Sequence, residues 1–337
     1  MRSETSTSDA TGGSRAMTLR QAILEAIGEA MEADPAVVMI GQDLGAFGGP
    51  LKSSDGLHTR FGSSRIIETG ICESSMTSLA VGMAVQGMRP IVEIMFSDFL
   101  PIAATAIVQL AANLRYYSGN TGSVPMVIRT KGGDGPYRSH PQNYEAMFAH
   151  SPGLTIVSPS DAVSAKGLMK SAIASNDPVL FIENIFLYNA FRENVPAGDI
   201  VVPLGKAAVA REGKDVTIVT YGRTVRTAIS AANQLARDSV DVEVIDLRTI
   251  SPFDEETVLR SVNKTGRLVV AHEAWEVGGI GAEIVSRVTR KAFGSLACAP
   301  ELIGAPAVPV PWAEPLRDLL IPSVARITDA VMKVVRK

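Results

Sequence analysis

The sequence has few cysteines, no excess of charge and no long hydrophobic run. Cys72 and Cys298 are its only cysteines, and their wide spacing excludes a disulfide framework and a zinc motif. Thirty-two basic and 35 acidic residues leave a net charge of −3, too balanced for nonspecific nucleic-acid binding. No apolar run reaches the ~18–20 residues that cross a bilayer. We therefore expect no nucleic-acid partner, no membrane insertion, and a reducing, cytoplasmic location.

The remaining pattern predicts an α/β protein. With 337 residues, 46% hydrophobic and 20% charged, the chain is expected to be globular and to form two domains. Short apolar runs rich in β-branched residues alternate with segments of helical period, which predicts mostly parallel sheets flanked by helices. In the first half the predicted strands are 37–41, 91–96, 124–129, 154–157 and 179–183, and the predicted helices are 74–87, 97–117 and 164–175.

Composition also suggests where the domains begin and end. Residues 1–16, rich in Ser, Thr and Gly, are predicted to be a disordered leader. The first domain is then 17–190, and its first helix should start after Thr18, which has Gln three residues later as in a capping box. An aperiodic Pro- and Gly-containing linker covers 191–205. The second domain, 206–337, has predicted strands at 216–222, 242–247 and 268–273 and predicted helices at 224–237, 254–262 and 281–293.

Glu73 is a candidate functional acid, since it follows a predicted strand and directly precedes a helix. An acid at a helix start is usually a cap or a partner of the helix dipole. The apolar neighbours Ile71, Cys72 and Met76 favour a second interpretation, in which the carboxyl is a general acid.

His140 is the second candidate, because it lies in a loop dense in Gly, Pro and polar residues between a strand and a helix. A surface histidine without a role is an equally good interpretation from sequence. His150 and His272 lie at the ends of a helix and a strand, where hydrogen bonding within the fold is the better interpretation.

Two glycine motifs are interpreted as ordinary turns. Gly133-Asp134-Gly135 lacks an asparagine about thirty residues later, which a magnesium-binding motif of this kind requires, so we assign no metal site to this chain. Residues 278–281 (GGIG) depart from the dinucleotide-binding pattern and come too late in the chain for it.

Four long segments together resemble one family. They are GQDLGAFGGP (41–50), GLHTRFGSSRIIETGICES (56–74), GMAVQGMRPIVEIMFSDF (82–99) and AHSPGLTIVSPSDAVSAKGLMKSAI (149–173). The chain is similar to β subunits of the 2-oxo acid dehydrogenase decarboxylase components, which act on pyruvate, branched-chain 2-oxo acids or acetoin and belong to the transketolase-like thiamine diphosphate superfamily. Residues 244–274 and 278–284 resemble the C-terminal domain of that family.

The resemblance implies a pyrimidine-binding domain followed by a transketolase-like C-terminal domain. The thiamine-activating glutamate of the family falls on Glu73, which would share a proton with N1′ of the aminopyrimidine. Phe99 matches the aromatic residue that contacts the pyrimidine, with Met95 and Ile71 lining the pocket. For Met95 and Ile71, core packing at strand ends is a serious alternative.

His140 matches the catalytic histidine of the family, which assists at the substrate or in acyl transfer to lipoamide. Here Ser139 replaces an adjacent second histidine and Pro141 replaces a serine, which leaves the substrate and acceptor open. Arg138 beside His140 would suit an anionic or phosphorylated substrate, such as the sugar phosphate of a transketolase-like reaction. The resemblance also allows a structural potassium ion in the turn 172–177, through backbone carbonyls and side chains.

The implied function is oxidative decarboxylation of a 2-oxo acid with acyl transfer to a lipoyl carrier. A separate α subunit would hold the diphosphate and Mg²⁺, in a heterotetramer of two α and two β chains. A lipoyl-bearing acyltransferase or carrier protein would be the next partner. The alternative is a split transketolase-like subunit that moves a two-carbon ketol unit from a sugar phosphate to an aldose or a carrier protein. A purely structural partner chain is a third hypothesis.

Overall fold

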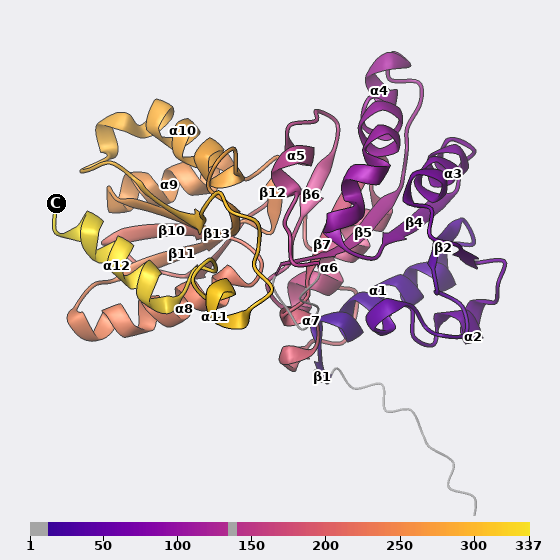
Figure 1. The fold of residues 1–337 in the computed structure, drawn as a ribbon, viewed down its shortest axis with the longest axis horizontal. Helices are drawn as coiled ribbons and strands as arrows, with labels where there is room; N and C mark the ends of the chain where they lie inside the picture. Colours follow the sequence, from indigo (N-terminus) through magenta and orange to yellow (C-terminus); the bar gives the residue numbers. More distant parts are fainter. Residues whose placement is uncertain (1–12, 134–139) are drawn as a thin grey trace, which may run out of the picture.

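The computed structural model describes residues 13–133 and 140–337 (Figure 1). Within these residues a seven-stranded sheet has the order β12-β6-β7-β5-β4-β2-β3 and a five-stranded sheet the order β14-β13-β10-β11-β9. Helices cover both faces of each sheet (Figure 1). The predicted fold, two mostly parallel sheets flanked by helices, is confirmed.

The first sheet contains six parallel strands, of which all but the edge strand are largely buried on both faces. They are β2 (Val37–Gln42), β3 (Ile66–Thr69), β4 (Arg89–Ile94), β5 (Val127–Gly132), β6 (Thr155–Val157) and β7 (Val179–Asn184), all parallel. Met39 and Ile91 pack with α1 (Leu19–Ala33) and α6 (Ala162–Ala174), whereas Ile40 packs on the opposite face. Burial on both faces explains the apolar runs in β2, β4 and β7, whereas the second half of β5 carries the buried charged residues Arg129 and Lys131.

The opposite face is covered by α3 (Glu73–Val85) and by an irregular helical segment. Sequence predicts one helix over 97–117, but the structure has a 3₁₀ helix η2 (Ser97–Ala103), a π-helix η3 (Thr105–Ala112) and α4 (Leu114–Tyr117). The chain bends by 61° after Ala103. Pro101 lies inside η2, and a proline has no N–H for a helical hydrogen bond.

The helix start predicted at Thr18 is confirmed. Thr18 is the N-cap of α1, its hydroxyl accepts from Gln21 N, and the Gln21 side chain accepts from Thr18 N. The remaining short elements of this half are η1 (Pro50–Lys52), α2 (Leu57–Phe61), α5 (Glu145–Ala149) and α7 (Leu187–Ala190). No single helix in the described ranges is long and apolar enough to cross a membrane; only the bent pair at 97–117 meets both conditions together.

The second sheet contains β9 (Ala208–Arg211), β10 (Val216–Thr220), β11 (Val242–Asp246), β13 (Leu268–Trp275) and β14 (Glu301–Ala305). α8 (Thr224–Leu235) and α12 (Val324–Val335) pack on one face, and α9 (Glu255–Thr265) and α10 (Ile280–Ala292) on the other. The short elements are η4 (Ala236–Asp238), η5 (Phe293–Ser295) and α11 (Glu314–Arg317).

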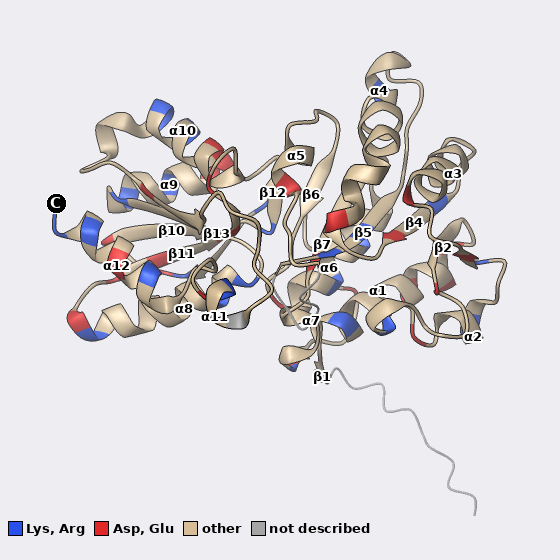
Figure 2. Ribbon diagram, in the orientation of Figure 1, with Lys and Arg blue, Asp and Glu red and all other residues tan. Residues whose placement is uncertain are grey.

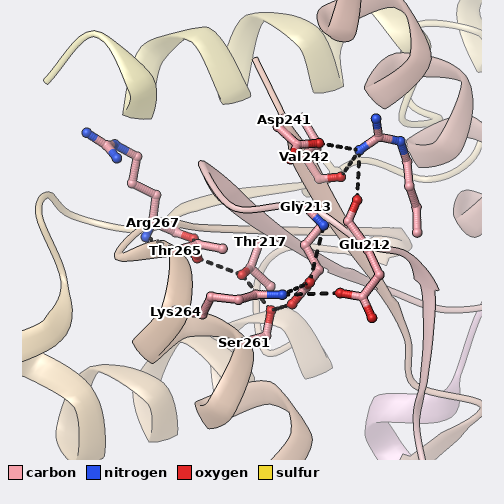
Figure 3. Close-up of polar contacts among 11 residues, drawn as sticks. Glu212, Gly213, Thr217, Asp241, Val242, Ser261, Lys264, Thr265 and Arg267 are labelled. Atoms are coloured by element: carbon pink, nitrogen blue, oxygen red, sulfur yellow. Dashed lines mark hydrogen bonds and ion pairs between the residues drawn. The ribbon is translucent and has the colours of Figure 1, made fainter. Parts of the chain in front are cut away.

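A buried polar cluster ties α9 to two strands of this sheet (Figure 3). The Thr217 hydroxyl lies 2.7 Å from both Ser261 Oγ and Thr265 Oγ1. Lys264 forms an ion pair with the buried Glu243, which also accepts from Ser261. Burial alone would raise the pKa of Glu243, but Lys264 and Ser261 outweigh it and hold the pKa below its usual value.

Three segments depart from the expected domain boundaries. Arg15 and Ala16, assigned to the leader, belong to β1 (Arg15–Met17), which pairs with β8 (Glu193–Val195) inside the expected linker. Residues 1–12 of the leader lie outside the described residues. The strand β12 (Thr249–Ser251), which belongs to the second half in sequence, pairs with β6 and so joins the first sheet.

Candidate functional site

The candidate site lies at the carboxyl edge of the first sheet. β2 pairs with β3 on one side and with β4 on the other, so the direction of winding reverses there. Parallel α/β sheets bind ligands outside the carboxyl ends of strands at such a reversal. Glu73 follows β3, whereas Met95 and Phe99 follow β4. Three of the predicted site residues therefore meet at the edge that suits a ligand.

Glu73 is the first residue of α3, and it is nearly buried, with 8% of its surface exposed. Met76 is buried beside it in the helix, and Cys72, the N-cap, makes no side-chain capping bond. Within residues 13–133 and 140–337, the Glu73 carboxyl has no hydrogen-bond or ion-pair partner. This carboxyl therefore suits a bound group that exchanges a proton with it, such as an aminopyrimidine.

Phe99 and His140 come together in the structure. Their ring centroids lie 4.8 Å apart, and a second ring, Phe96, stacks on His140 at 4.9 Å. η2, which carries Phe99, packs against α3. Met95 is half-buried, but Ile71 is 75% exposed, so this chain alone does not enclose it in a pocket.

Ser97, Asp98 and Gln142 were not singled out from sequence, although they neighbour Phe99 and His140. Asp98 accepts from the backbone N and the side-chain amide of Gln142, and Ser97 donates to the Gln142 carbonyl. Burial raises the pKa of Asp98, while the Gln142 hydrogen bonds and attraction to His140 act in the opposite direction. The sequence signal that could have identified them is their position, since Ser97 and Asp98 directly precede Phe99 and Gln142 lies two residues after His140.

Several residues of the histidine loop fall outside the described part of the chain, among them Asp134, Gly135, Arg138 and Ser139. Gly133, which is described, has φ +82°. This left-handed backbone conformation favours glycine, and a Cβ there would lie 2.5 Å from Asn184 Nδ2, so the Asn184 side chain would have to move. Within the described residues, no group of three or more His, Cys, Asp or Glu side chains is placed to hold a metal.

The GGIG segment has the structural role expected from sequence. Gly279 caps α10, and the backbone N of Gly281 donates to His272 Nε2 at 3.2 Å. A Cβ on Gly281 would lie 2.5 Å from that nitrogen. Burial lowers the pKa of His272 to about 4, so the ring is neutral at pH 7 and can accept this bond. His150 is exposed at the end of α5.

The turn 172–177 does not fit a potassium ion well. Arg89 donates to the carbonyls of Ile173 and Ser175, each at 2.9 Å, and to the side chain of Asn176. Arg115 forms an ion pair with Asp177. Guanidinium groups thus bind two carbonyls and two side chains of this turn, and we assign no potassium ion to it.

Family models match both halves of the chain. The model of the transketolase pyrimidine binding domain covers residues 15–189, and that of the transketolase C-terminal domain covers 205–327. The chain belongs to this transketolase-like family, whose cofactor is thiamine diphosphate.

Named relatives narrow the resemblance. The chain is 42% identical to the β subunit of acetoin:2,6-dichlorophenolindophenol oxidoreductase of Cupriavidus necator, over 96% of this chain and 98% of the relative. It is also 42% identical to the β subunits of the pyruvate dehydrogenase E1 component of Rickettsia felis (94% and 98% covered) and Staphylococcus aureus (83% and 87% covered).

Solved structures support the fold. A structure described as a split gene transketolase, inactive beta4 tetramer, has a TM-score of 0.78 at 24% identity and covers 96% of this chain and 99% of its own. A Pichia stipitis transketolase mutant has a TM-score of 0.69 at 17% identity, over 97% of this chain and 46% of its own. Because the dehydrogenase subunits are much more similar in sequence, the comparisons favour the dehydrogenase interpretation over the split transketolase.

Proposed function

We propose that this chain is the β subunit of a thiamine diphosphate-dependent 2-oxo acid dehydrogenase. The observation that supports this most directly is Glu73, which is 8% exposed and has no side-chain partner among residues 13–133 and 140–337, in a chain 42% identical to pyruvate and acetoin dehydrogenase β subunits. When bound, thiamine diphosphate would supply the carbon nucleophile that this chemistry requires. Glu73 would hold a proton at N1′ of the aminopyrimidine, and Phe99 and Met95 would contact that ring. Ile71 would join them only in the assembled enzyme.

An α subunit is proposed to complete the site and to hold the diphosphate and Mg²⁺. The surface beside Glu73 supports this, because residues 74–88 and 99–114 contain no charged side chain. Large apolar side chains are also exposed there: Leu79 on α3, Ile102 on η2 and Leu110 on η3. These helices are tan along most of their length in Figure 2. Uncharged exposed helix faces are typical of protein interfaces.

His140, between Phe96 and Phe99, is proposed to act on the substrate side or in acyl transfer. The acyl acceptor is proposed to be a lipoyl-bearing acyltransferase or carrier protein. Cys72 and Cys298 are free, which fits work in the reducing cytoplasm.

The test is turnover by the chain assembled with an α-type partner. Lipoamide-dependent oxidation of pyruvate or a branched-chain 2-oxo acid supports the proposal, and cleavage of a ketose phosphate without decarboxylation would favour the split transketolase. Glu73→Gln should lower kcat by ~10²–10⁴-fold, since general acid–base groups contribute about that much. Glu256→Gln is the matched control, because Glu256 also lies in the first turn of a helix but is exposed. Glu73→Gln activity within a few-fold of the parent would remove the catalytic assignment.

A further inference from the structure

The segment that carries His140 is clamped to the start of η2. Phe96 stacks on the imidazole at an interplanar angle of 29°, and Phe99 lies against it at 58°. The two residues between them, Ser97 and Asp98, bind Gln142, two positions after the histidine. Four consecutive residues, the N-cap of η2 and its first three residues, therefore contact the stretch 140–142 from a distant part of the sequence.

Gln142 is bound at every polar group it possesses. Its backbone N donates to Asp98 Oδ2 at 3.3 Å, and its side-chain Nε2 donates to Asp98 Oδ1 at 3.0 Å. Its carbonyl accepts from Ser97 Oγ, and its Oε1 accepts from the Tyr144 hydroxyl at 3.0 Å. A glutamine held at both ends of its amide and at both backbone groups has little freedom to rotate.

Pro141 transmits this restraint to the histidine. Its ring fixes φ near −65°, and it restricts the backbone of His140, the residue before it. Fixing Gln142 therefore limits where the His140 side chain can lie. Asp98 supplies two of the four hydrogen bonds, more than any other residue in the clamp.

We propose that Asp98 is a positioning residue for His140, which acts through Gln142 to hold the imidazole between Phe96 and Phe99. The expected effect of Asp98 on turnover rests on the proposed function of His140. The expected effect of Asp98 on the position of the imidazole does not. The alternative for Asp98 is a purely local role as an acid in the first turn of η2.

The direct test is NMR of the full-length chain with labelled histidine. Two aromatic rings within 5 Å should displace the His140 ring-proton resonances from those of a free histidine, and His140→Gln assigns them among the four histidines. Asp98→Ala should move these resonances most of the way to free-histidine values. Asp98→Asn keeps one acceptor for Gln142 and should retain about half of the displacement.

Asp254→Ala is the matched control. Asp254 likewise accepts a backbone and a side-chain hydrogen bond, from Thr257, but it lies in the second half of the chain at the start of α9. It should lower stability without moving the His140 resonances. Unchanged His140 resonances in folded Asp98→Ala, or in Asp98→Asn if the alanine variant does not fold, would overturn the proposal.

Turnover separates this inference from the proposed function. In the assembled enzyme Asp98→Ala should lower kcat by about 10²-fold with KM nearly unchanged, because misplacing a reacting group by about 1 Å has an effect of that size. Adding His140→Gln should lower kcat no further. If His140→Gln alone leaves kcat unchanged, the catalytic role of His140 fails, whereas a shift of the His140 resonances toward free-histidine values in Asp98→Ala would still support the positioning role.

Discussion

Asp246 is a buried acid where the two halves of the chain meet. It ends β11, and it accepts from Ser160 Oγ of the first half at 2.5 Å and from the backbone N of Arg248 at 3.0 Å. Burial raises the pKa of Asp246 from 3.8 to about 6, with nearby Asp161 adding to the rise and the two hydrogen bonds opposing it. The folded chain thus favours the protonated form of this group.

The sign of the pH dependence follows from that pKa. Between pH 3.8 and about 6 the folded state holds a proton that the unfolded state has released, so ionisation lowers stability as the pH rises. The loss is complete above the folded-state pKa and amounts to on the order of 3 kcal/mol. Asp246→Asn should therefore be more stable than the parent at about pH 8, and this advantage should shrink toward about pH 4.

Urea unfolding of both proteins across this pH range measures the difference. Asp329→Asn, at an exposed position on α12, is the control and should follow the parent at every pH. Stability curves for Asp246→Asn that run parallel to the parent would contradict the assigned ionisation.

At the scale of elements, α3 combines two roles. Its first residue is the candidate acid, and its inner face packs on the first sheet through Ala80 and Val81. Its outer face carries Leu79 and Val85, both about half exposed. A helix that is apolar on all sides is typically buried, so the proposed α subunit would complete the burial of α3.

Leu79→Lys tests that interface. A lysine at this exposed site should change the stability of the isolated chain by less than about 0.5 kcal/mol. It should abolish co-purification with a tagged α subunit, because binding would bury an unpaired charge. Phe293→Lys, at an exposed apolar position in η5 of the second half, should leave co-purification intact. Retained binding by Leu79→Lys would place the interface elsewhere.

Elements with a strong period or a continuous apolar run could be predicted from sequence. The buried strands β2, β4, β5, β6 and β7 and the helices α1, α3 and α6 were recognised, because burial on both faces or a capping box leaves a clear pattern. The break at Pro101 and the π-helical turn after it were missed, since Ala-rich sequence satisfies a regular helix equally well. Three-residue β12 is too short to show any period.

The candidate site was only partly predictable. Glu73 and His140 could be singled out by their position after strands, and Phe99 by resemblance. The clamp through Asp98 and Gln142 depends on contacts between residues 44 positions apart, which no local pattern encodes. Ile71 shows the limit of the resemblance. The resemblance assigns this residue to the pyrimidine pocket, but its side chain is exposed on the single chain.

At the scale of the whole molecule, the two halves are joined by shared structure. β12 completes the first sheet, although it follows strands of the second. Tyr221, just after β10, donates to the buried Glu145 at 2.7 Å, and Asn184 donates to Glu273 across the same boundary. Burial raises the pKa of Glu145, which the Tyr221 bond partly offsets. Unfolding either half would expose groups that the other half covers.

We therefore expect the chain to unfold in a single transition. Both tryptophans, Trp275 and Trp312, lie in the second half, so their fluorescence reports that half, whereas far-ultraviolet circular dichroism reports the whole chain. The two urea curves should coincide. Tyr221→Phe should lower the free energy of unfolding by about 1–3 kcal/mol, because the buried Glu145 loses its partner.

In Tyr221→Phe the urea midpoints from fluorescence and from circular dichroism should decrease by the same amount, because we expect both halves to unfold as one cooperative unit. Tyr116→Phe is the control, because Tyr116 is 86% exposed on α4, and its curves should match the parent. Fluorescence that changes at lower urea than circular dichroism in the parent would show that the second half unfolds alone. The pairing of β12 with β6 and the bonds across the boundary would then be too weak to make the two halves unfold together.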